Sequence, residues 1–202
     1  MAEVKILLEG SHSLVNDKVY INSTVTLVKS ENKRILVDTS HLWDKGKLLM
    51  ALKKENLFPG DIDIVILTHT HLDHTANLHL FSKAKIFAKF IGSYPGQLHN
   101  ISEKCIERHE IKDGTKITKD VEFLFTPGHS IDSLSVVVKT DKGIVVVSGD
   151  AIASEHFADI NNNPEEFLLY NLKKYKKSKQ KILKIADWVI PGHGKMFKNE
   201  NI

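Results

Sequence analysis

Short apolar runs bounded by polar turn residues recur along the chain, and such runs are typical of β-strands. In the first third they lie at Val4–Leu8, Thr24–Lys29 and Arg34–Asp38, the last two separated by a turn at residues 30–33. We predict further strands at Asp61–Leu67, Ala84–Ala88, Val121–Phe125, Ser133–Lys139, Gly143–Ser148 and Trp188–Ile190. The run at 61–67 is largely apolar on both faces, which indicates a strand buried on both sides.

Helical periodicity follows the first group of strands. Leu48, Leu49 and Leu52 share one face of a helix predicted at Lys45–Glu55, and the Pro-Gly pair at residues 59–60 is a signal for its end. Two more helices are predicted, a short one at Asn77–Phe81 and a long lysine-rich one from Pro164 to about Ile185. We expect the stretch Gly92–Asp120 to be loop-rich.

The strands form two groups, each followed by a helix, and the chain shows no internal repeat or low-complexity linker. Two sheets packed face to face with helices outside fit this order, because each sheet then buries one face against the other. With 202 residues and 42% hydrophobic content, the chain can build one sizeable core. The predicted fold class is therefore α/β, an αββα four-layer sandwich, with residues 1–202 forming one domain.

The composition favours a cytoplasmic protein without membrane contact. No segment approaches the roughly 20 apolar residues needed to cross a bilayer, and the first residues do not resemble a signal peptide. Cys105 is the single cysteine, so it cannot form an internal disulfide, which fits a reducing compartment. The net charge of +3 permits an anionic substrate but is too small for a dedicated nucleic-acid binder.

Eleven histidines are many for this length, and their placement indicates a metal centre. The sequence THTHLDH follows the predicted strand 61–67 and supplies His69, His71, Asp73 and His74. Three later strands also end in small-residue turns, in the sequences TPGH, SGD and PGHG. These turns supply three more side chains of the kind that bind metals: His129, Asp150 and His193. A single histidine of this kind is ordinarily a surface residue, so the prediction rests on the ensemble.

Imidazole and carboxylate are ligands of borderline divalent metals such as zinc, while iron or manganese would also suit them. Seven candidate ligands are too many for one tetrahedral ion and about right for two. His69 and His71, two positions apart on an extended segment, point the same way and can bind one ion. Asp73 and His74 are then turned toward a second ion, and the two oxygens of Asp150 can bridge both. We therefore expect two divalent ions, zinc in the first instance.

The motif HxHxDH, followed in order by a distant His, an Asp and a His, resembles the metallo-β-lactamase-fold superfamily, and in particular its small members. The resemblance covers nearly the whole chain. It assigns His69, His71 and His129 to one metal and Asp73, His74 and His193 to the other, with Asp150 bridging. It also implies that Asp38 supports the ligand loop from behind. The activity it implies is hydrolysis by a metal-bridging hydroxide, which we expect Asp73 to orient as a catalytic residue.

The substrate implied by the resemblance is a phosphodiester, as in RNA, or a small thioester or lactone. One alternative is a glyoxalase II-like thioester hydrolase without the helical C-terminal domain. Another is a redox enzyme similar to the mono-iron persulfide dioxygenases, which use only the first metal position. The penicillin-hydrolysing branch with a metal-binding cysteine is disfavoured, because an aspartate stands at position 150 where that branch has its cysteine.

Partner contacts are less constrained by the sequence. The lysine run of the last predicted helix is typically a solvated face, although it could also contact phosphates: Lys173, Lys174, Lys176, Lys177, Lys179, Lys181 and Lys184. His156, His12 and His41 are weaker candidates for lining the site. A homodimer could form through the helix at 45–55 or through residues 92–120. Trp43 and Trp188 are interpreted as core or interface residues.

Overall fold

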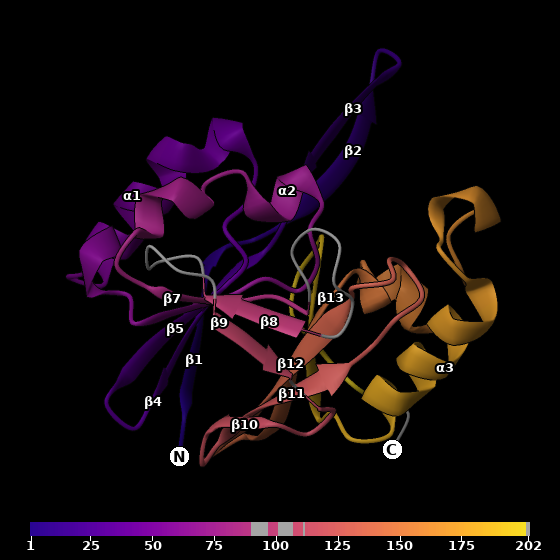
Figure 1. Cartoon of the computed structure of the whole chain (residues 1–202). Helices are drawn as coiled ribbons and strands as arrows, with labels where there is room; N and C mark the ends of the chain where they lie inside the picture. Colours follow the sequence, from indigo (N-terminus) through magenta and orange to yellow (C-terminus); the bar gives the residue numbers. More distant parts are fainter. Residues whose placement is uncertain (90–96, 101–106, 111, 201–202) are drawn as a thin grey trace.

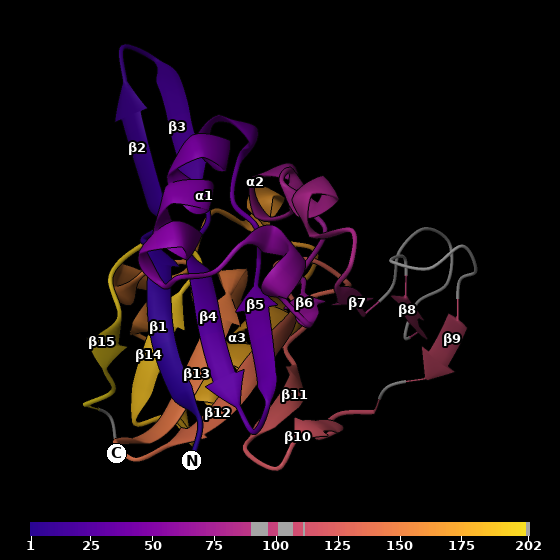
Figure 2. The same cartoon turned by 90° about the vertical axis from the view of Figure 1, so that its left-hand side faces the viewer.

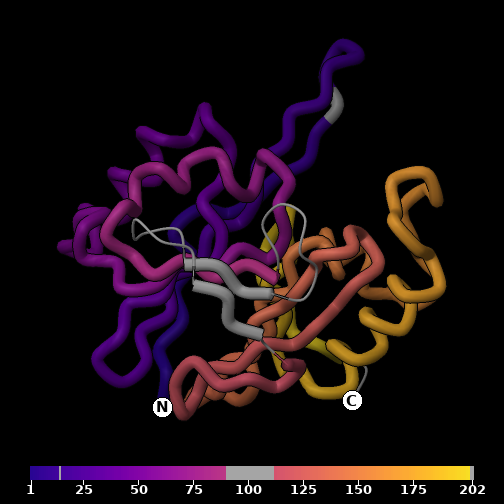
Figure 3. Tube along the Cα trace, viewed as in Figure 1, coloured from indigo at the N-terminus to yellow at the C-terminus, as the bar shows by residue number. Residues whose placement is uncertain are grey.

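Two β-sheets packed face to face form the centre of the molecule, with helices on both outer sides (Figure 1). The computed structural model describes residues 1–89, 97–100, 107–110 and 112–200. The N-terminal half of the chain builds one sheet and the C-terminal half builds the other, as the colours of the tube in Figure 3 show. The αββα sandwich predicted from the order of strands and helices is therefore confirmed.

The first sheet has the strand order β1-β4-β5-β6-β7 and the second β10-β11-β12-β13-β14-β15. The first contains β1 (Glu3–Leu8), β4 (Val25–Ser30), β5 (Lys33–Val37), β6 (Ile64–Ile66) and β7 (Lys85–Phe87). The second contains β10 (Lys116–Thr118), β11 (Val121–Phe125), β12 (Leu134–Thr140), β13 (Gly143–Gly149), β14 (Trp188–Pro191) and β15 (Phe197–Lys198). Two-stranded ribbons are formed by β2 (Ser11–Val15) with β3 (Lys18–Asn22) and by β8 (Gln97–Asn100) with β9 (Glu107–Glu110).

Three helices and several single 3-10 turns complete the described part of the chain. The helices are α1 (Lys45–Lys54), α2 (Leu72–Thr75) and α3 (Leu172–Leu183). The 3-10 turns are η1 (Leu42–Asp44), η2 (Pro59–Asp61), η3 (Leu78–Phe81), η4 (Asp150–Ile152), η5 (Glu155–Ala158) and η6 (Glu166–Leu168). The short helix predicted near residue 78 is thus a 3-10 turn.

Apolar burial accounts for the four layers. The inner faces of the two sheets share one core, in which Val37, Ile66, Val136 and Ile190 are fully buried. On the outer side of the first sheet, α1 contributes Leu48 and Leu52 to a second cluster, and α3 and η4 cover the second sheet with a third. Each fully buried aliphatic side chain contributes about 1.5–3 kcal/mol relative to exposure, so these faces fix where the helices lie.

Strand direction determines where the site lies. β5, β6 and β7 run parallel to one another, and β13 runs parallel to β14. β11 is antiparallel to β12, which is antiparallel to β13, so β11 and β13 run the same way. The segments that follow β6, β11, β13 and β14 consequently emerge together at one edge of the sandwich.

The lysine-rich helix begins later than its sequence suggested. α3 starts at Leu172, and the side chain of Asn171 caps it by accepting a hydrogen bond of 2.8 Å from the Lys174 N–H. Pro164 instead lies in the irregular segment before η6, so the prediction that it opens the helix is wrong. The asparagine cap satisfies an otherwise free N–H of the first turn, which explains why the helix begins here.

The hairpin β2–β3 was not predicted, because its residues alternate only weakly between apolar and polar. Asn16 and Asp17 form its turn with φ of 49° and 58°, the left-handed pair of a two-residue hairpin turn that asparagine and aspartate tolerate. The hairpin projects from the body of the molecule beside α2 (Figures 1 and 2). The stretch after residue 92 also holds strands β8, β9 and β10, and β15 follows the strand expected to be last.

Candidate metal centre

The histidine-rich loop connects β6 to the short helix α2 and lies at the edge where the strand ends converge. His69 is buried at the end of the extended segment, whereas His71 is exposed and directly precedes α2. The first turn of α2 then turns Asp73 and the fully buried His74 inward. The chain changes from strand to helix within these seven residues, and the candidate ligand side chains before and after this change therefore point in two different directions.

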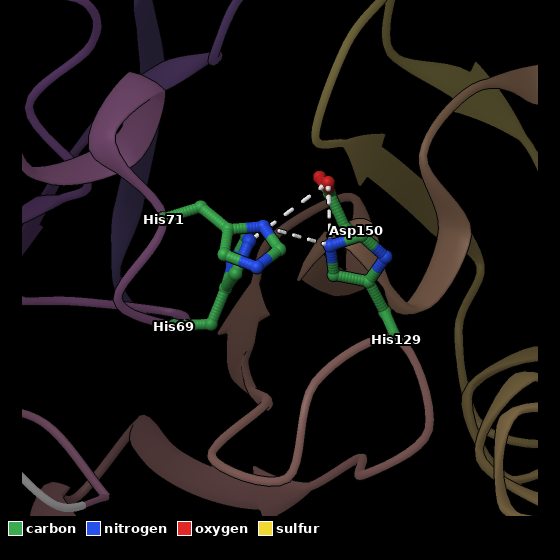
Figure 4. A group of neighbouring side chains, drawn as sticks. All are labelled: His69, His71, His129 and Asp150. Atoms are coloured by element: carbon green, nitrogen blue, oxygen red, sulfur yellow. Dashed lines mark hydrogen bonds and ion pairs between the residues drawn. The ribbon is translucent and has the colours of Figure 1, made fainter. Parts of the chain in front are cut away.

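Two groups of ligand atoms result, and within each group all ligand atoms lie within 4.8 Å of one another. The first donor group is formed by His69, His71 and His129, together with Asp150 (Figure 4). In it, 3.1 Å separate His129 Nε2 from His71 Nδ1. The second donor group is formed by Asp73, His74 and His193. All seven residues predicted to bind metal are thus brought together by the fold.

Asp150 lies between the two groups. Its Oδ2 is 3.3 Å from His129 Nε2 and 3.9 Å from His69 Nε2. Its Oδ1 is 3.3 Å from His74 Nε2, and His193 Nε2 lies 3.2 Å from both oxygens. A carboxylate in contact with both groups is suited to bridge two cations.

Glycine makes the approach of Asp150 feasible. The preceding residue, Gly149, has φ of +51°, and a Cβ there would lie 2.6 Å from Thr68 Oγ1. A Cβ on Gly192 would overlap Asp150 Oδ1 itself. These two glycines therefore allow the turns after β13 and β14 to close on the same point.

Asp38 supports the second donor group from behind, as the resemblance implied. Its Oδ2 is 2.8 Å from His74 Nδ1 and also accepts a hydrogen bond from Thr68 Oγ1, while its Oδ1 accepts one from the Thr68 N–H. Asp38 has φ of +61°, a strained conformation for a residue with a Cβ. The contacts compensate for this strain and direct His74 Nε2 toward Asp73 and Asp150.

Two further supports were missed by the sequence analysis. The Asn22 carbonyl, at the base of the β2–β3 hairpin, lies 3.0 Å from His193 Nδ1. Asp132 Oδ2 accepts hydrogen bonds from the Thr70 N–H and Oγ1 at 2.9 and 2.8 Å. A backbone carbonyl leaves no sequence signal, whereas Asp132, three residues after His129, could have been suspected from its position.

The electrostatics separate the histidines into two types. Burial lowers the pKa of His69 well below its ordinary value, helped by His74, and burial also lowers the pKa of His129. Burial opposes charge on His74 and His193 as well, but neighbouring carboxylates outweigh it and raise both pKa values. Although burial alone would raise the pKa of Asp150, His193 and His74 hold it well below its usual range. Neutral imidazoles and an ionised carboxylate are the states that bind metals.

The residues fit a metal better than a metal-free polar core. His69 Nε2, His74 Nε2, Asp73 Oδ2 and Asp150 Oδ1 are buried without a hydrogen-bond partner among the described residues. An unsatisfied buried polar group costs about 1–3 kcal/mol, and more when it is charged. Four such atoms that converge on two points are accounted for if each is a metal ligand.

The weaker candidates lie elsewhere. His156 and His12 are exposed, and His41 caps η1 while its ring stacks on Trp43 at 6.2 Å between centroids. Trp43 is 84% exposed, which contradicts a place in the core of this chain. Trp188 packs against the core between the sheets, as expected. Tyr94 and Cys105 lie outside the described residues, as do the side chains of residues 99 and 109.

The fold and the site together define a class of protein. Residues 21–193 match the family model of the metallo-β-lactamase superfamily. The chain belongs to this superfamily and is a metal-dependent hydrolase, as the sequence motifs had predicted. No described helix is long and apolar enough to span a membrane.

Several curated proteins resemble the chain over most of its length. Metallo-beta-lactamase domain-containing protein 1 of Xenopus laevis is 32% identical, over 96% of this chain and 81% of its own length. The protein of the same name from Rattus norvegicus is 34% identical over 81% of the chain. A protein of Methanocaldococcus jannaschii named as a metallo-hydrolase is 32% identical over 82% of the chain and 74% of its own length. The chain spans only 62% of the length of the rat relative.

Solved structures show the same fold. A metallo-β-lactamase-like protein of Thermotoga maritima superposes with a TM-score of 0.75 at 23% identity, over 98% of this chain and 99% of the other. An N-acyl homoserine lactone hydrolase superposes with a TM-score of 0.67 at 17% identity, over 95% and 92% of the two chains. That enzyme was solved with its product bound at the catalytic metal centre.

Proposed function

We propose that this protein is a binuclear hydrolase that binds two divalent ions, zinc in the first instance, and cleaves a phosphodiester. The observation that carries the binuclear proposal is the position of Asp150, whose carboxylate contacts histidines of both donor groups. A mono-iron enzyme would need only the first group. The second group, with its buried His74 and the supporting Asp38, would then have no role.

Different residues of the chain would bind the two ions and orient the attacking water. His69, His71 and His129 would hold one ion, Asp73, His74 and His193 the other, and Asp150 would contact both. Two bound ions would supply an acidified water and polarise the bond under attack. Asp73 Oδ2 is buried, lies 3.5 Å from His74 Nε2 and 3.6 Å from His193 Nε2, and has no described hydrogen-bond partner. It is placed to accept a hydrogen bond from the attacking water and so orient it.

The substrate proposal is a phosphodiester, as in RNA, and it is supported by charge at the rim of the site. Lys89 donates a hydrogen bond of 3.0 Å to the Ile131 carbonyl, two residues from His129, and forms no ion pair with a described carboxylate. A cation beside the first donor group, without an ion pair to a described residue, favours an anionic substrate over a neutral lactone. A small thioester or lactone is the second candidate, since a lactone hydrolase shares the fold.

Metal analysis of protein purified without added metal tests the binuclear proposal. Two zinc ions per chain are expected, with both lost on prolonged dialysis against a chelator and hydrolysis restored when zinc is returned. A His71→Ala variant should lose an ion, whereas His79→Ala, an exposed histidine outside the site, should keep both. A single iron per chain, with oxygen consumption on a persulfide, would overturn the proposal in favour of the redox alternative.

A substrate panel tests the proposed bond type. Metal-loaded protein should cleave bis-p-nitrophenyl phosphate and short RNA, and His71→Ala should abolish both activities while His79→Ala retains them. Hydrolysis of lactones or of glutathione thioesters with no cleavage of phosphodiesters would replace this substrate class by the second candidate or by the glyoxalase II-like alternative.

We further propose that the protein acts in the cytoplasm and forms a homodimer. The helix α1 exposes Met50, and the adjacent turn η1 exposes Leu42 and Trp43. Large apolar side chains grouped on one face are typical of a contact surface. Light scattering on the eluting protein should give twice the chain mass, and Trp43→Ser should shift it toward the monomer.

A further inference from the structure

Two lysines from distant parts of the chain lie beside the loop that carries His129, Lys89 against Ile131 and Lys174 against Tyr170. Lys89 follows β7 in the first sheet, and Lys174 lies in the first turn of α3, beyond the second sheet. Burial is the main cause that lowers the pKa of Lys89; the Asp132 carboxylate opposes it, and the nearby Lys174 ammonium lowers the pKa further. Like charges placed together are unfavourable, so an anion bound between them would stabilise this arrangement.

Lys89 has free hydrogen-bonding capacity in a partly desolvated position. Its Nζ donates one hydrogen bond, to the Ile131 carbonyl, and lies 4.8 Å from the centroid of the Phe125 ring. An ammonium has three donors, so two have no partner among the described residues and can serve a ligand. No described carboxylate forms an ion pair with Lys89, although Asp132 and Asp113 lie near enough to raise its pKa.

Lys174 is held beside the same loop through Tyr170. The Lys174 Nζ lies 5.4 Å from the centroid of the Tyr170 ring, which is half exposed. The backbone N–H of Tyr170 donates a hydrogen bond of 3.0 Å to the carbonyl of His129. Gly128 packs directly against the backbone of Tyr175 in α3. The start of α3 therefore cannot move independently of the ligand loop.

Lys89 is connected to the loop of His69 and His71 as well. Ile131, which accepts from Lys89, precedes Asp132, and the Asp132 carboxylate holds the backbone and hydroxyl of Thr70 between His69 and His71. A group held by the two ammoniums would thus lie next to the exposed side of the first donor group.

We propose that Lys89 and Lys174 form an anchor for a backbone phosphate adjacent to the bond that is cleaved, with the Tyr170 ring as a stacking surface for the neighbouring base. The proposal rests on the proposed function, because it gives the phosphodiester substrate at least one nucleotide beyond the scissile bond. Two ammonium groups match the several oxygens of a phosphate, and aromatic rings bind bases of any sequence.

The anchor uses only part of the lysine run. Lys179 is buried and donates to the carbonyls of Asp159 and Asn162, and Lys181 pairs with Asp113. Lys177 is exposed on the outer side of α3 and forms no interaction with a described residue. It is therefore a matched control on the same helix, with the same charge and no contact with the His129 loop.

Binding to metal-free protein tests the anchor separately from catalysis. Fluorescence anisotropy would follow a labelled single-stranded RNA of about eight nucleotides in chelator at several salt concentrations. For single strands, log K falls with log salt with a slope of about −0.7 per phosphate contact. The double variant Lys89→Gln/Lys174→Gln loses one phosphate contact and should therefore bind with a slope shallower by about 0.7, and Lys177→Gln should match the unmodified protein.

Kinetics with the metal-loaded protein provide the second test. We expect the double variant to raise KM for short RNA by about tenfold and to lower kcat/KM for bis-p-nitrophenyl phosphate, which has no second phosphate, by much less. Tyr170→Leu should raise KM for RNA less, and far-UV circular dichroism would verify that all variants are folded.

The outcomes separate the anchor from the proposed function. If the double variant changes RNA binding and KM no more than Lys177→Gln does, the proposed anchor is wrong, whether or not the protein cleaves phosphodiesters. Equal loss on RNA and on bis-p-nitrophenyl phosphate also overturns it, because the lysines would then act on the centre itself. If the double variant shows the expected shallower salt slope but the unmodified protein cleaves no phosphodiester, the two lysines do bind an anion and the proposed function is wrong.

Discussion

The two donor groups of the metal centre are built alike but supported differently. In the second group, His74 is fully buried against Asp38, and His193 is fixed by the Asn22 carbonyl. In the first group, His71 is exposed, and its Nε2 has no hydrogen bond to a described residue. Outer hydrogen bonds orient a ligand before the metal binds. The second group is therefore the preorganised half, and the first is the half that substrate can reach.

The largest effect is expected at Asp150, since it belongs to both halves. Asp150→Ala should lower kcat/KM at least about 10³-fold, because loss of both ions removes several kcal/mol of transition-state stabilisation. Metal analysis should show the loss of one or both ions. Asp159→Asn, an exposed aspartate outside the site, serves as the control. A protein that kept two ions without Asp150 would show that the halves are independent.

A comparison of His74→Ala with His71→Ala tests the difference in support directly, with metal removed. The first variant leaves the buried Asp38 carboxylate without its imidazole partner and should lower the free energy of unfolding by about 3–5 kcal/mol. His71→Ala removes an exposed ring and should change it by less than about 0.5 kcal/mol. Urea denaturation in chelator would measure both. Equal losses would contradict a preorganised second half.

Asp38→Asn should act through His74 rather than on the substrate. The amide can still accept a hydrogen bond but carries no charge, so we expect a loss of about 10–100-fold in metal affinity or activity. The loss of metal affinity should be confined to one of the two ions, as measured by competition with a chromophoric chelator. Asp44→Asn, a buried aspartate that binds Ser40 and Lys47 away from the centre, should leave both ions in place. If it weakens metal as much as Asp38→Asn, the proposed orienting role fails.

The smallest effect is expected for Asp132→Asn, the corresponding support of the first half. Asp132 holds Thr70, not a ligand side chain, so the histidines on either side keep their own directions. We expect a loss of activity below about tenfold, seen mainly in KM. A Thr70→Val variant, which removes only the side-chain hydrogen bond, should lose less. If Asp132→Asn lost more activity than Asp38→Asn, the first donor group would depend more on its supporting residue than the second, contrary to our expectation.

The strands and the ligand residues could be predicted because their causes are local. Runs such as Val121–Phe125 alternate or stay apolar over a few residues, and glycine and proline mark the turns that present the ligands. The start of α3 could not be read in this way. Proline at 164 is compatible with a first helical turn, but Asn171 offers a side-chain cap closer to the apolar residues that pack on the second sheet.

The β2–β3 hairpin and the exposure of Trp43 could not be predicted from the sequence for a different reason. Asn16-Asp17 is a turn signal, yet the strands beside it bury little and so lack a hydrophobic pattern. A tryptophan is ordinarily buried, and only the position of η1 at the surface makes Trp43 exposed.

The sequence by itself determined the class of fold, the seven candidate ligand residues and their order, since periodicity and turn chemistry are properties of neighbouring residues. The tertiary structure alone decided how the ligands divide in space. Parallel strand ends bring His69 and His129 together across 60 residues of chain, and Asp150 comes to lie between the groups only because Gly192 leaves room. The positions of Lys89 and Lys174 beside the His129 loop were likewise decided by packing, because no local pattern links two segments that far apart in the chain.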